Sequence, residues 1–168
     1  SLGARSINLA LEQHVGQLLD NGVQVLWQTG KLFASESDAL RRKFIDKPIV
    51  ITDFIYEMDE AYAAADIVVS RAGAIAVSEL CLIGKPVILV PFPHAAEDHQ
   101  TKNAMALVNE DAAIHIADAR VMNDLVPAVL KLNADEQLKQ RLGINILKHG
   151  YPNAAKDIAQ HVIDLAKP

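Results

Sequence analysis

The stretch SRAGAIAVSEL, residues 70–80, places Arg71 and Glu79 in a segment that is otherwise small or apolar. A guanidinium here could pair with a phosphate, stack on a base, or form a salt bridge at the rim of the core. A carboxylate about one turn inside a helix could accept hydrogen bonds from two ribose hydroxyls, or it could only complement the helix dipole. Both residues are therefore candidates for binding a nucleotide, and for each a purely structural role stays open.

Gly73 and Ala74 stand where a strand is expected to pass into a helix, and they leave the backbone amides of the first helical turn uncovered. Such a helix end binds anions through its free N–H groups and the positive end of its dipole, which suits a phosphate or diphosphate. The alternative is a tight turn without a ligand. Because the segment SLGA at residues 1–4 has the same character before another helical pattern, we expect two phosphate-binding helix ends.

The segment HAAEDHQ at residues 94–100 gathers polar side chains in a loop that follows Pro91 and Pro93. Its two histidines, with Glu97 and Asp98, could suggest a metal ion. They straddle a loop–helix junction, however, and do not share one helix face, so we expect no metal. Asp98 is predicted to be a helix N-cap. The sequence has no GxSxG, Cys–His pair or Walker A pattern, and it shows no complete catalytic set.

The hydrophobic pattern predicts the elements that must position these side chains. Strands are expected at residues 23–29, 49–52, 67–70, 87–90 and 113–117, and helices at 4–20, 35–45, 75–82, 98–110, 121–132, 135–149 and 154–166, with a further short helix between 53 and 66. This alternation predicts an α/β fold with a doubly wound, mostly parallel sheet. Ligands bind such sheets at the carboxyl ends of the strands, so the loops at 1–4, 52–58, 71–75 and 91–99 should form the site.

Composition limits the function further. The 168 residues, 51% hydrophobic, suit one domain, and a net charge of -5 argues against nucleic-acid binding. We interpret Arg41, Arg42 and Lys43 as one solvated helix face, and Cys81, the only cysteine, as a buried structural thiol. Without an apolar run of about 20 residues or a signal pattern, we expect a cytoplasmic location. The absent initial methionine predicts a piece of a longer protein.

Three parts of the chain closely resemble the C-terminal half of the MurG family of bacterial peptidoglycan N-acetylglucosaminyltransferases. They are SLGARSIN, the stretch TDFIYEMDEAYAAADIVVSRAGAIAVSELCLIGKPVILVPFPHAAEDHQTKNA, and the closing helices. The resemblance covers nearly the whole chain and is most specific at residues 66–104. It implies the Rossmann-like C-terminal half of a GT-B glycosyltransferase, with residues 1–168 as a single UDP-sugar-binding domain that lacks the N-terminal acceptor domain.

The resemblance also implies the activity, which is inverting transfer of GlcNAc from UDP-GlcNAc to undecaprenyl-diphospho-N-acetylmuramoyl-pentapeptide in peptidoglycan synthesis. No cofactor is implied. The missing N-terminal domain would bind the lipid-linked acceptor, and we expect the catalytic base in that domain or between the domains. Only the full-length protein would contact the membrane, at the cytoplasmic face of the plasma membrane. We therefore expect this fragment to bind UDP-GlcNAc and to transfer nothing.

By position, the resemblance places uracil near Phe54 and Ile55, with the Ile55 backbone pairing the base edge and Arg71 close by, and the ribose hydroxyls at Glu79. The remaining implied contacts are those to the diphosphate, from Ser1, Gly73, Ala74, Ile75 and Ala76, and those to the sugar hydroxyls, from His99 and Gln100 with Asn103 behind them. Two positions depart from the usual pattern. Ala76 replaces a common Ser or Thr, and His99 stands where some members have glutamine, so the sugar contact of His99 is the weakest of these assignments.

Three other hypotheses about the function compete with this interpretation. The chain could be a naturally separate nucleotide-sugar-binding subunit of a two-chain GlcNAc transferase, or a UDP-sugar 2-epimerase-like domain, although these loops show no acid–base residues for epimerisation. A third reading, from another class, is a non-enzymatic α/β binding module of the receiver or flavodoxin type. A receiver would need a phosphorylatable aspartate at a strand end, where this sequence has Thr29, Ser70 and Val90.

Overall fold

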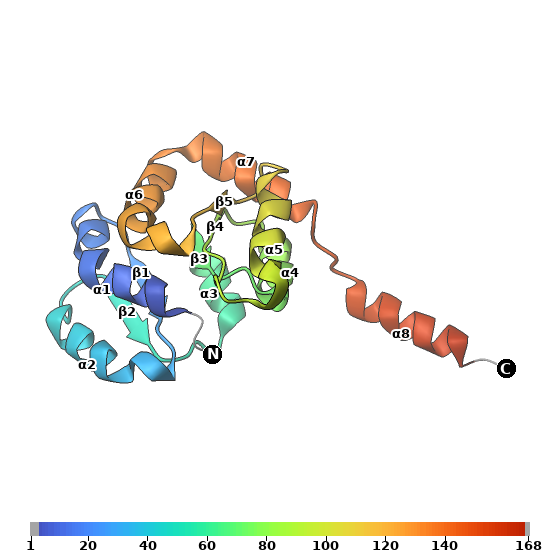
Figure 1. Cartoon of the computed structure of the whole chain (residues 1–168), viewed down its shortest axis with the longest axis horizontal. Helices are drawn as coiled ribbons and strands as arrows, with labels where there is room; N and C mark the ends of the chain where they lie inside the picture. The colour runs from blue at the N-terminus through green and yellow to red at the C-terminus, as the bar shows by residue number, and fades with distance from the viewer. Residues whose placement is uncertain (1–3, 167–168) are drawn as a thin grey trace.

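The computed structural model describes residues 4–166, which form parallel β-sheets flanked by helices (Figure 1). Strand β1 (Val25–Gln28) pairs in parallel with β2 (Ile49–Thr52), with Val25 opposite Ile49. A second sheet has β4 (Val87–Leu89) between β3 (Val68–Ser70) and β5 (Ile114–His115), again all parallel. The predicted parallel α/β architecture is confirmed. The described strands fall into two sheets, however, where the sequence suggested one.

The helices lie within a few residues of their predicted positions, because the apolar spacing that defines most of them, and the end signals of some, are visible in the sequence. Gly22 and Gly84, for example, end α1 and α4 with positive φ angles of 76° and 65°. The helices are α1 (Arg5–Asp20), α2 (Ala34–Lys43), α3 (Met58–Ala64), α4 (Ala74–Ile83), α5 (His99–Val108), α6 (Val121–Ala134), α7 (Glu136–Leu147) and α8 (Ala154–Leu165), with short 3-10 turns η2 (Lys31–Phe33), η3 (Ala96–Asp98) and η4 (Asp118–Arg120).

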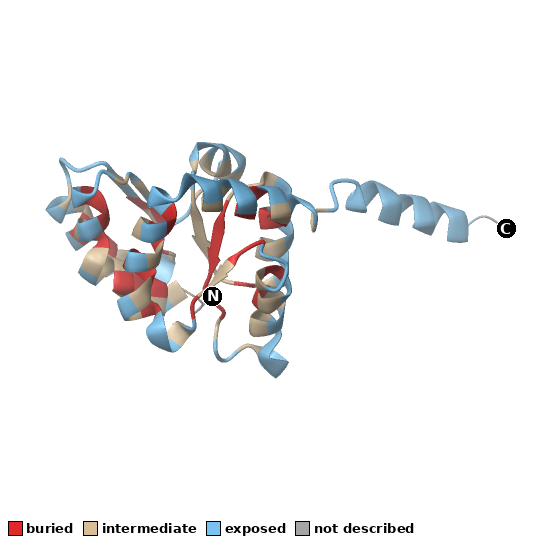
Figure 2. Cartoon of the chain, turned by 90° about the horizontal axis from the view of Figure 1, so that it is seen from above, coloured by how far each residue is buried: buried red, intermediate tan, exposed pale blue. Residues whose placement is uncertain are grey.

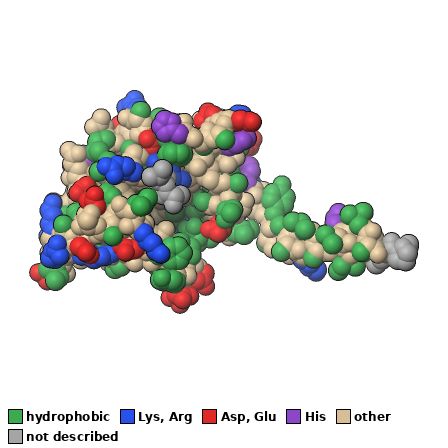
Figure 3. Space-filling model, turned by 60° about the horizontal axis from the view of Figure 1, so that its bottom comes forward, with side chains coloured by type: hydrophobic (Ala, Val, Ile, Leu, Met, Phe, Trp, Pro, Cys, Tyr) green, Lys and Arg blue, Asp and Glu red, His purple; other side chains and the backbone are tan. Residues whose placement is uncertain are grey.

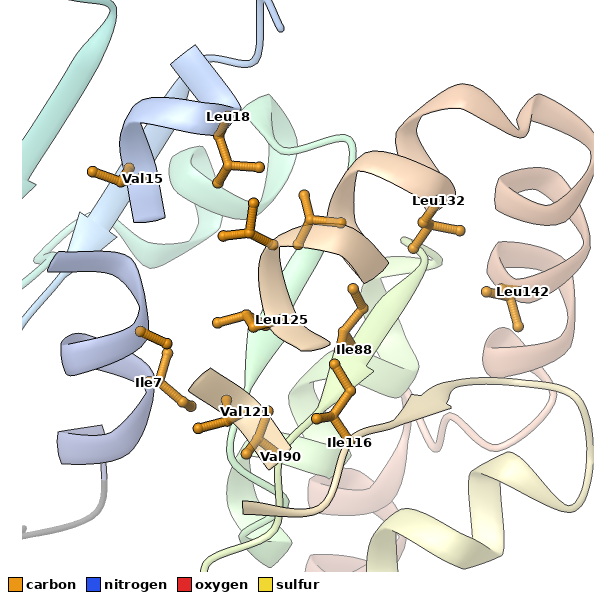
Figure 4. Packing of buried hydrophobic residues seen from close by; sticks show 13 residues of the cluster. Ile7, Val15, Leu18, Ile88, Val90, Ile116, Val121, Leu125, Leu132 and Leu142 are labelled. Atoms are coloured by element: carbon orange, nitrogen blue, oxygen red, sulfur yellow. The ribbon is translucent and has the colours of Figure 1, made fainter. Parts of the chain in front are cut away.

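The main hydrophobic core joins the two sheets. Helix α1 packs along α6, and Figure 4 shows Leu125 of α6 between Ile7 of α1 and Ile88 of β4. Side chains from both sheets, including Val25 and Val69, pack against this same cluster. Buried side chains therefore hold the first turn of α1 beside the carboxyl ends of the second sheet, although the two sheets share no backbone ladder in the described residues.

A second core lies on the other face of the β3–β5 sheet, under α4, α5 and α7. Cys81 of α4 is buried there, and burial raises the pKa of its thiol, as expected for a structural cysteine. Gly143 of α7 lies against the end of α4. A Cβ at this position would stand 2.5 Å from the Gly84 carbonyl oxygen, so only glycine permits the approach.

Helix α8 projects from the rest of the molecule and is exposed along its whole length (Figure 2). Its apolar side chains include Ile158, Val162 and Ile163, all more than half exposed. Among residues 4–166, no helix combines the length and the apolar character that a membrane crossing requires.

Candidate functional site

The predicted site residues follow the carboxyl ends of β2, β3 and β4, or lie on the helices that begin there. Figure 3 brings the bottom of the molecule in Figure 1 forward, and this face carries hydrophobic, basic and acidic side chains with no single charge dominating. Phe54 and Ile55 come after β2, Arg71 and Gly73 after β3, and His99 at the start of α5. Ser1 lies outside the described residues.

The first turn of α4 is open, as the sequence predicted. Gly73 occupies the N-cap with φ of -65° and ψ of 149°, and no side chain caps the helix. A Cβ built on Gly73 would meet nothing within 4 Å, and Ile75 in the same turn is 79% exposed. The amides of Ala74, Ile75 and Ala76 precede the first intrahelical bond, in which Val77 N–H donates to the Gly73 carbonyl. This end of α4 can therefore receive an anion.

Two side chains of α5 hold the loop before α4. Gln100 Oε1 accepts hydrogen bonds from the backbone N–H of Ala72 at 3.2 Å and of Phe92 at 3.0 Å. Asn103 Nδ2 donates to the Ala72 carbonyl oxygen at 3.0 Å, so the buried Ala72 residue is bonded through both of its backbone polar groups. The structure thus gives Gln100 and Asn103 a role in positioning the loop. Their contacts to a sugar stay a prediction.

Arg71 takes the salt-bridge alternative. Its Nη1 pairs with Asp118 Oδ1 at 2.5 Å and donates to the carbonyl oxygens of Val90 and Pro91, while Nη2 donates to Ser6 Oγ at 2.9 Å. The guanidinium also lies 5.6 Å from the centre of the Phe92 ring. These contacts join Arg71 to three other segments of the chain. A contact with uracil stays a prediction.

Glu79 lies on α4 and is exposed, and the phenolic hydroxyl of Tyr62 on α3 approaches its Oε2 at 3.4 Å. Burial, followed by the negative charge of Glu79 and this hydrogen bond, raises the pKa of Tyr62. The contact places the two side chains together on the exposed side of α4. The carboxylate can accept further hydrogen bonds there, as the ribose assignment requires.

The loop after β2 is tethered by two polar contacts that the sequence analysis missed. Gln28 Oε1, at the end of β1, accepts a hydrogen bond from the Ile55 N–H at 2.8 Å. Arg41 pairs with Asp53 at 2.8 Å and donates to the Ile51 carbonyl oxygen, so this residue of the solvated helix face also holds the loop while its side chain stays 37% exposed. The hydrogen bond and charge of Asp53 raise the pKa of Arg41.

Aromatic side chains are exposed in this same loop. Phe54 is 52% exposed and meets Tyr56 edge to face, with ring centres 5.0 Å apart. The Ile55 N–H already donates to Gln28, so a base that accepts a hydrogen bond from this N–H would have to displace Gln28. The predicted pairing of Ile55 with uracil is otherwise compatible with this exposed position.

The loop before α5 differs from the prediction in one respect. Asp98 occupies the N-cap position, but its φ is 55° and its side chain caps no backbone amide; it accepts instead from the Thr101 hydroxyl at 2.6 Å. His99 is exposed, and its Nε2 lies 3.7 Å from Glu97 Oε2. Across residues 4–166, no three His, Cys, Asp or Glu side chains are grouped so as to hold a metal ion.

Comparisons with known proteins find relatives of this chain by sequence and by structure. The family model described as the glycosyltransferase family 28 C-terminal domain matches residues 1–162. The chain is 46% identical over 165 residues to a UDP-N-acetylglucosamine–N-acetylmuramyl-(pentapeptide) pyrophosphoryl-undecaprenol N-acetylglucosamine transferase of Parabacteroides distasonis, covering 98% of this chain and 45% of the relative. A relative of the same name from Bacteroides fragilis is 47% identical over 171 residues, covering 99% of this chain and 44% of the relative.

Among solved structures, the crystal structure of Acinetobacter baumannii MurG is similar, with a TM-score of 0.77 and 31% sequence identity. The alignment covers 98% of this chain and 46% of that one. The chain therefore spans less than half the length of the relatives and of the structure that it matches.

Proposed function

The chain belongs to the glycosyltransferase family 28 C-terminal domain family, and from this membership we propose that it is the UDP-GlcNAc-binding half of a GlcNAc transferase of peptidoglycan synthesis. The names of its relatives give the acceptor as an N-acetylmuramyl-(pentapeptide) pyrophosphoryl-undecaprenol. The whole protein would transfer GlcNAc to this lipid-linked acceptor with inversion, at the cytoplasmic face of the membrane.

One observation carries the proposal: the first turn of α4 is uncapped, opens onto free space at Gly73, and follows a loop whose Ala72 peptide groups are fixed by α5. Backbone amides held in this way need little reorganisation to bind a diphosphate. Glu79, about one turn further along α4, would accept hydrogen bonds from the ribose hydroxyls. Phe54 and the Ile55 backbone would contact the base.

The same amides would serve the reaction. When the bond between GlcNAc and UDP breaks, negative charge grows on the leaving diphosphate, and donors that are already aimed at it stabilise the transition state. The acceptor hydroxyl must also lose its proton to a general base. We assign that base, with the acceptor site, to the part of the whole protein beyond this chain.

Calorimetric titration of this chain with UDP-GlcNAc, UDP and ADP tests the proposal. We expect UDP-GlcNAc and UDP to bind and ADP to bind much more weakly. Glu79→Ala should weaken UDP binding roughly tenfold or more, because hydrogen bonds to a charged group contribute about 1.5–3 kcal/mol. Glu110→Ala removes the same charge from an exposed position at the end of α5 and should leave UDP binding unchanged.

Equal affinity for UDP and ADP, or unchanged UDP binding by the Glu79 variant, would contradict the assignment. A second measurement addresses the reaction. We expect this chain, mixed with UDP-GlcNAc and the lipid-linked acceptor, to show no transfer of GlcNAc. Measurable turnover would mean that the catalytic base lies within these residues.

A further inference from the structure

Asp118, which the sequence analysis did not single out, lies at the centre of a partly buried polar cluster with Ser6 and Arg71. Asp118 Oδ1 accepts from Arg71 Nη1 and from Ser6 Oγ, each at 2.5 Å, and Arg71 Nη2 donates to the same Ser6 oxygen at 2.9 Å. The side chains of Arg71 and Asp118 are only 14% and 20% exposed. Hydrogen bonds that involve charged groups with so little solvent are stronger and more directional than those at the surface.

This cluster joins four segments that are distant in the sequence. Ser6 lies in the first turn of α1, Arg71 in the loop between β3 and α4, and Asp118 in η4 after β5. Arg71 also donates to the carbonyl oxygens of Val90 and Pro91, in the loop after β4. The start of α1 and the start of α4 are thereby connected through one carboxylate.

We propose that Asp118 is a positioning residue for the diphosphate: it holds Arg71 and Ser6 so that the N-terminal ends of α1 and α4 keep a fixed separation. The inference rests on the proposed function, which places the diphosphate at the first turn of α4, and on the expectation from the sequence that the start of α1 is a second phosphate-binding helix end. Asp118 itself does not contact the ligand. Its effect passes through Arg71 to the Ala72–Gly73 loop and through Ser6 to the first turn of α1.

The charge of Asp118 provides a way to separate this role from a direct electrostatic one. A carboxylate near a bound diphosphate repels it, so removal of Asp118 would strengthen UDP binding if charge alone mattered. If position matters, the loss of the bonds to Arg71 and Ser6 weakens binding of the diphosphate part. Phe54 and Ile55, which are proposed to hold the base, lie on a different loop, after β2, so their contribution to binding should not change.

The experiment is a calorimetric comparison of UDP and uridine binding by the whole 168-residue chain and by Asp118→Ala and Asp118→Asn. For Asp118→Ala we expect UDP affinity to fall about tenfold, the equivalent of one hydrogen bond to a charged group, and uridine affinity to change less than about twofold. Asp118→Asn keeps an oxygen acceptor at this position and should retain most of the UDP affinity.

Asp124→Ala is the matched control, because Asp124 pairs with Arg120 on the surface at 2.6 Å and reaches none of the cluster. It should leave both affinities unchanged. Circular dichroism and retained uridine binding report that each variant is folded. Should Asp118→Ala strengthen UDP binding, or weaken UDP and uridine equally, the positioning role is wrong while the proposed function stands. If the unchanged chain binds UDP no better than uridine, the proposed function fails and this inference fails with it.

Discussion

The two sides of the candidate site are held very differently. Before α4, the Ala72 N–H and carbonyl are both bonded to side chains of α5, and Arg71 contacts three other segments. After β2, the Ile55 N–H is held by one exposed glutamine, and Phe54 and Tyr56 are largely exposed. The side that we propose for the phosphates is therefore already formed without a ligand. On the base side, more of the free energy of binding would be used to order the loop.

Among the variants that test this difference, Gln100→Leu is expected to have the largest effect on stability and on UDP binding. The change leaves the buried Ala72 N–H and the Phe92 N–H without their acceptor, which should lower the free energy of unfolding by about 1–3 kcal/mol. UDP affinity should fall about tenfold because the loop before α4 is no longer fixed. Urea unfolding and calorimetry measure the two effects, and UDP is used because it lacks the sugar that Gln100 is predicted to contact.

Thr101→Val is the control for Gln100→Leu. It removes the hydrogen bond that the Thr101 hydroxyl donates to Asp98, at the exposed start of the same helix. If the Gln100 variant is as stable and binds UDP as tightly as the Thr101 variant, the loop keeps its conformation without the hydrogen bonds to Gln100.

Gly73→Ala should separate binding from folding. The backbone angles at Gly73 suit any residue and a Cβ meets open space, so the free energy of unfolding should stay equal or rise by up to about 1 kcal/mol. UDP affinity should fall roughly fivefold, because the new methyl group occupies the room over the first amides of α4. Gly16→Ala in α1, where a Cβ also meets nothing, is the matched control and should bind UDP normally. Full UDP affinity in the Gly73 variant would place the diphosphate elsewhere.

The smallest effect is expected from Gln28→Leu on the base side. Water can take over the exposed Ile55 N–H, so the free energy of unfolding should change by less than about 1 kcal/mol. Uridine and UDP affinity should fall together, by about threefold, because only the base loop is loosened. Gln24→Leu changes an exposed glutamine before β1 and is the control in the same titrations. A loss confined to UDP would show that the two sides are not independent.

The sequence predicted the elements well because their signals are local. Apolar spacing defines α1 and α4, and a glycine with positive φ follows each of them. It was also predictable that the candidate residues would lie near one another, since the loops after parallel strands lie at one edge of a sheet. The role of Arg71 was not, because its partner Asp118 is 47 residues away. Asp98 occupies the predicted N-cap position, but its side chain caps no backbone amide, and its left-handed backbone, with φ of 55°, was indicated by no sequence pattern.

The contact of Gly143 in α7 with the end of α4 limits which substitutions this protein tolerates. Any side chain at Gly143 would collide with the Gly84 carbonyl oxygen, at the end of α4 opposite the proposed ligand. To make room, α7 and the end of α4 would have to separate, and any shift of α4 would carry its amino-terminal amides away from their place. In a saturation mutagenesis survey scored by growth, position 143 should therefore tolerate as few replacements as the residues that touch the donor, and ranking by tolerance alone would misreport a packing position as a binding one.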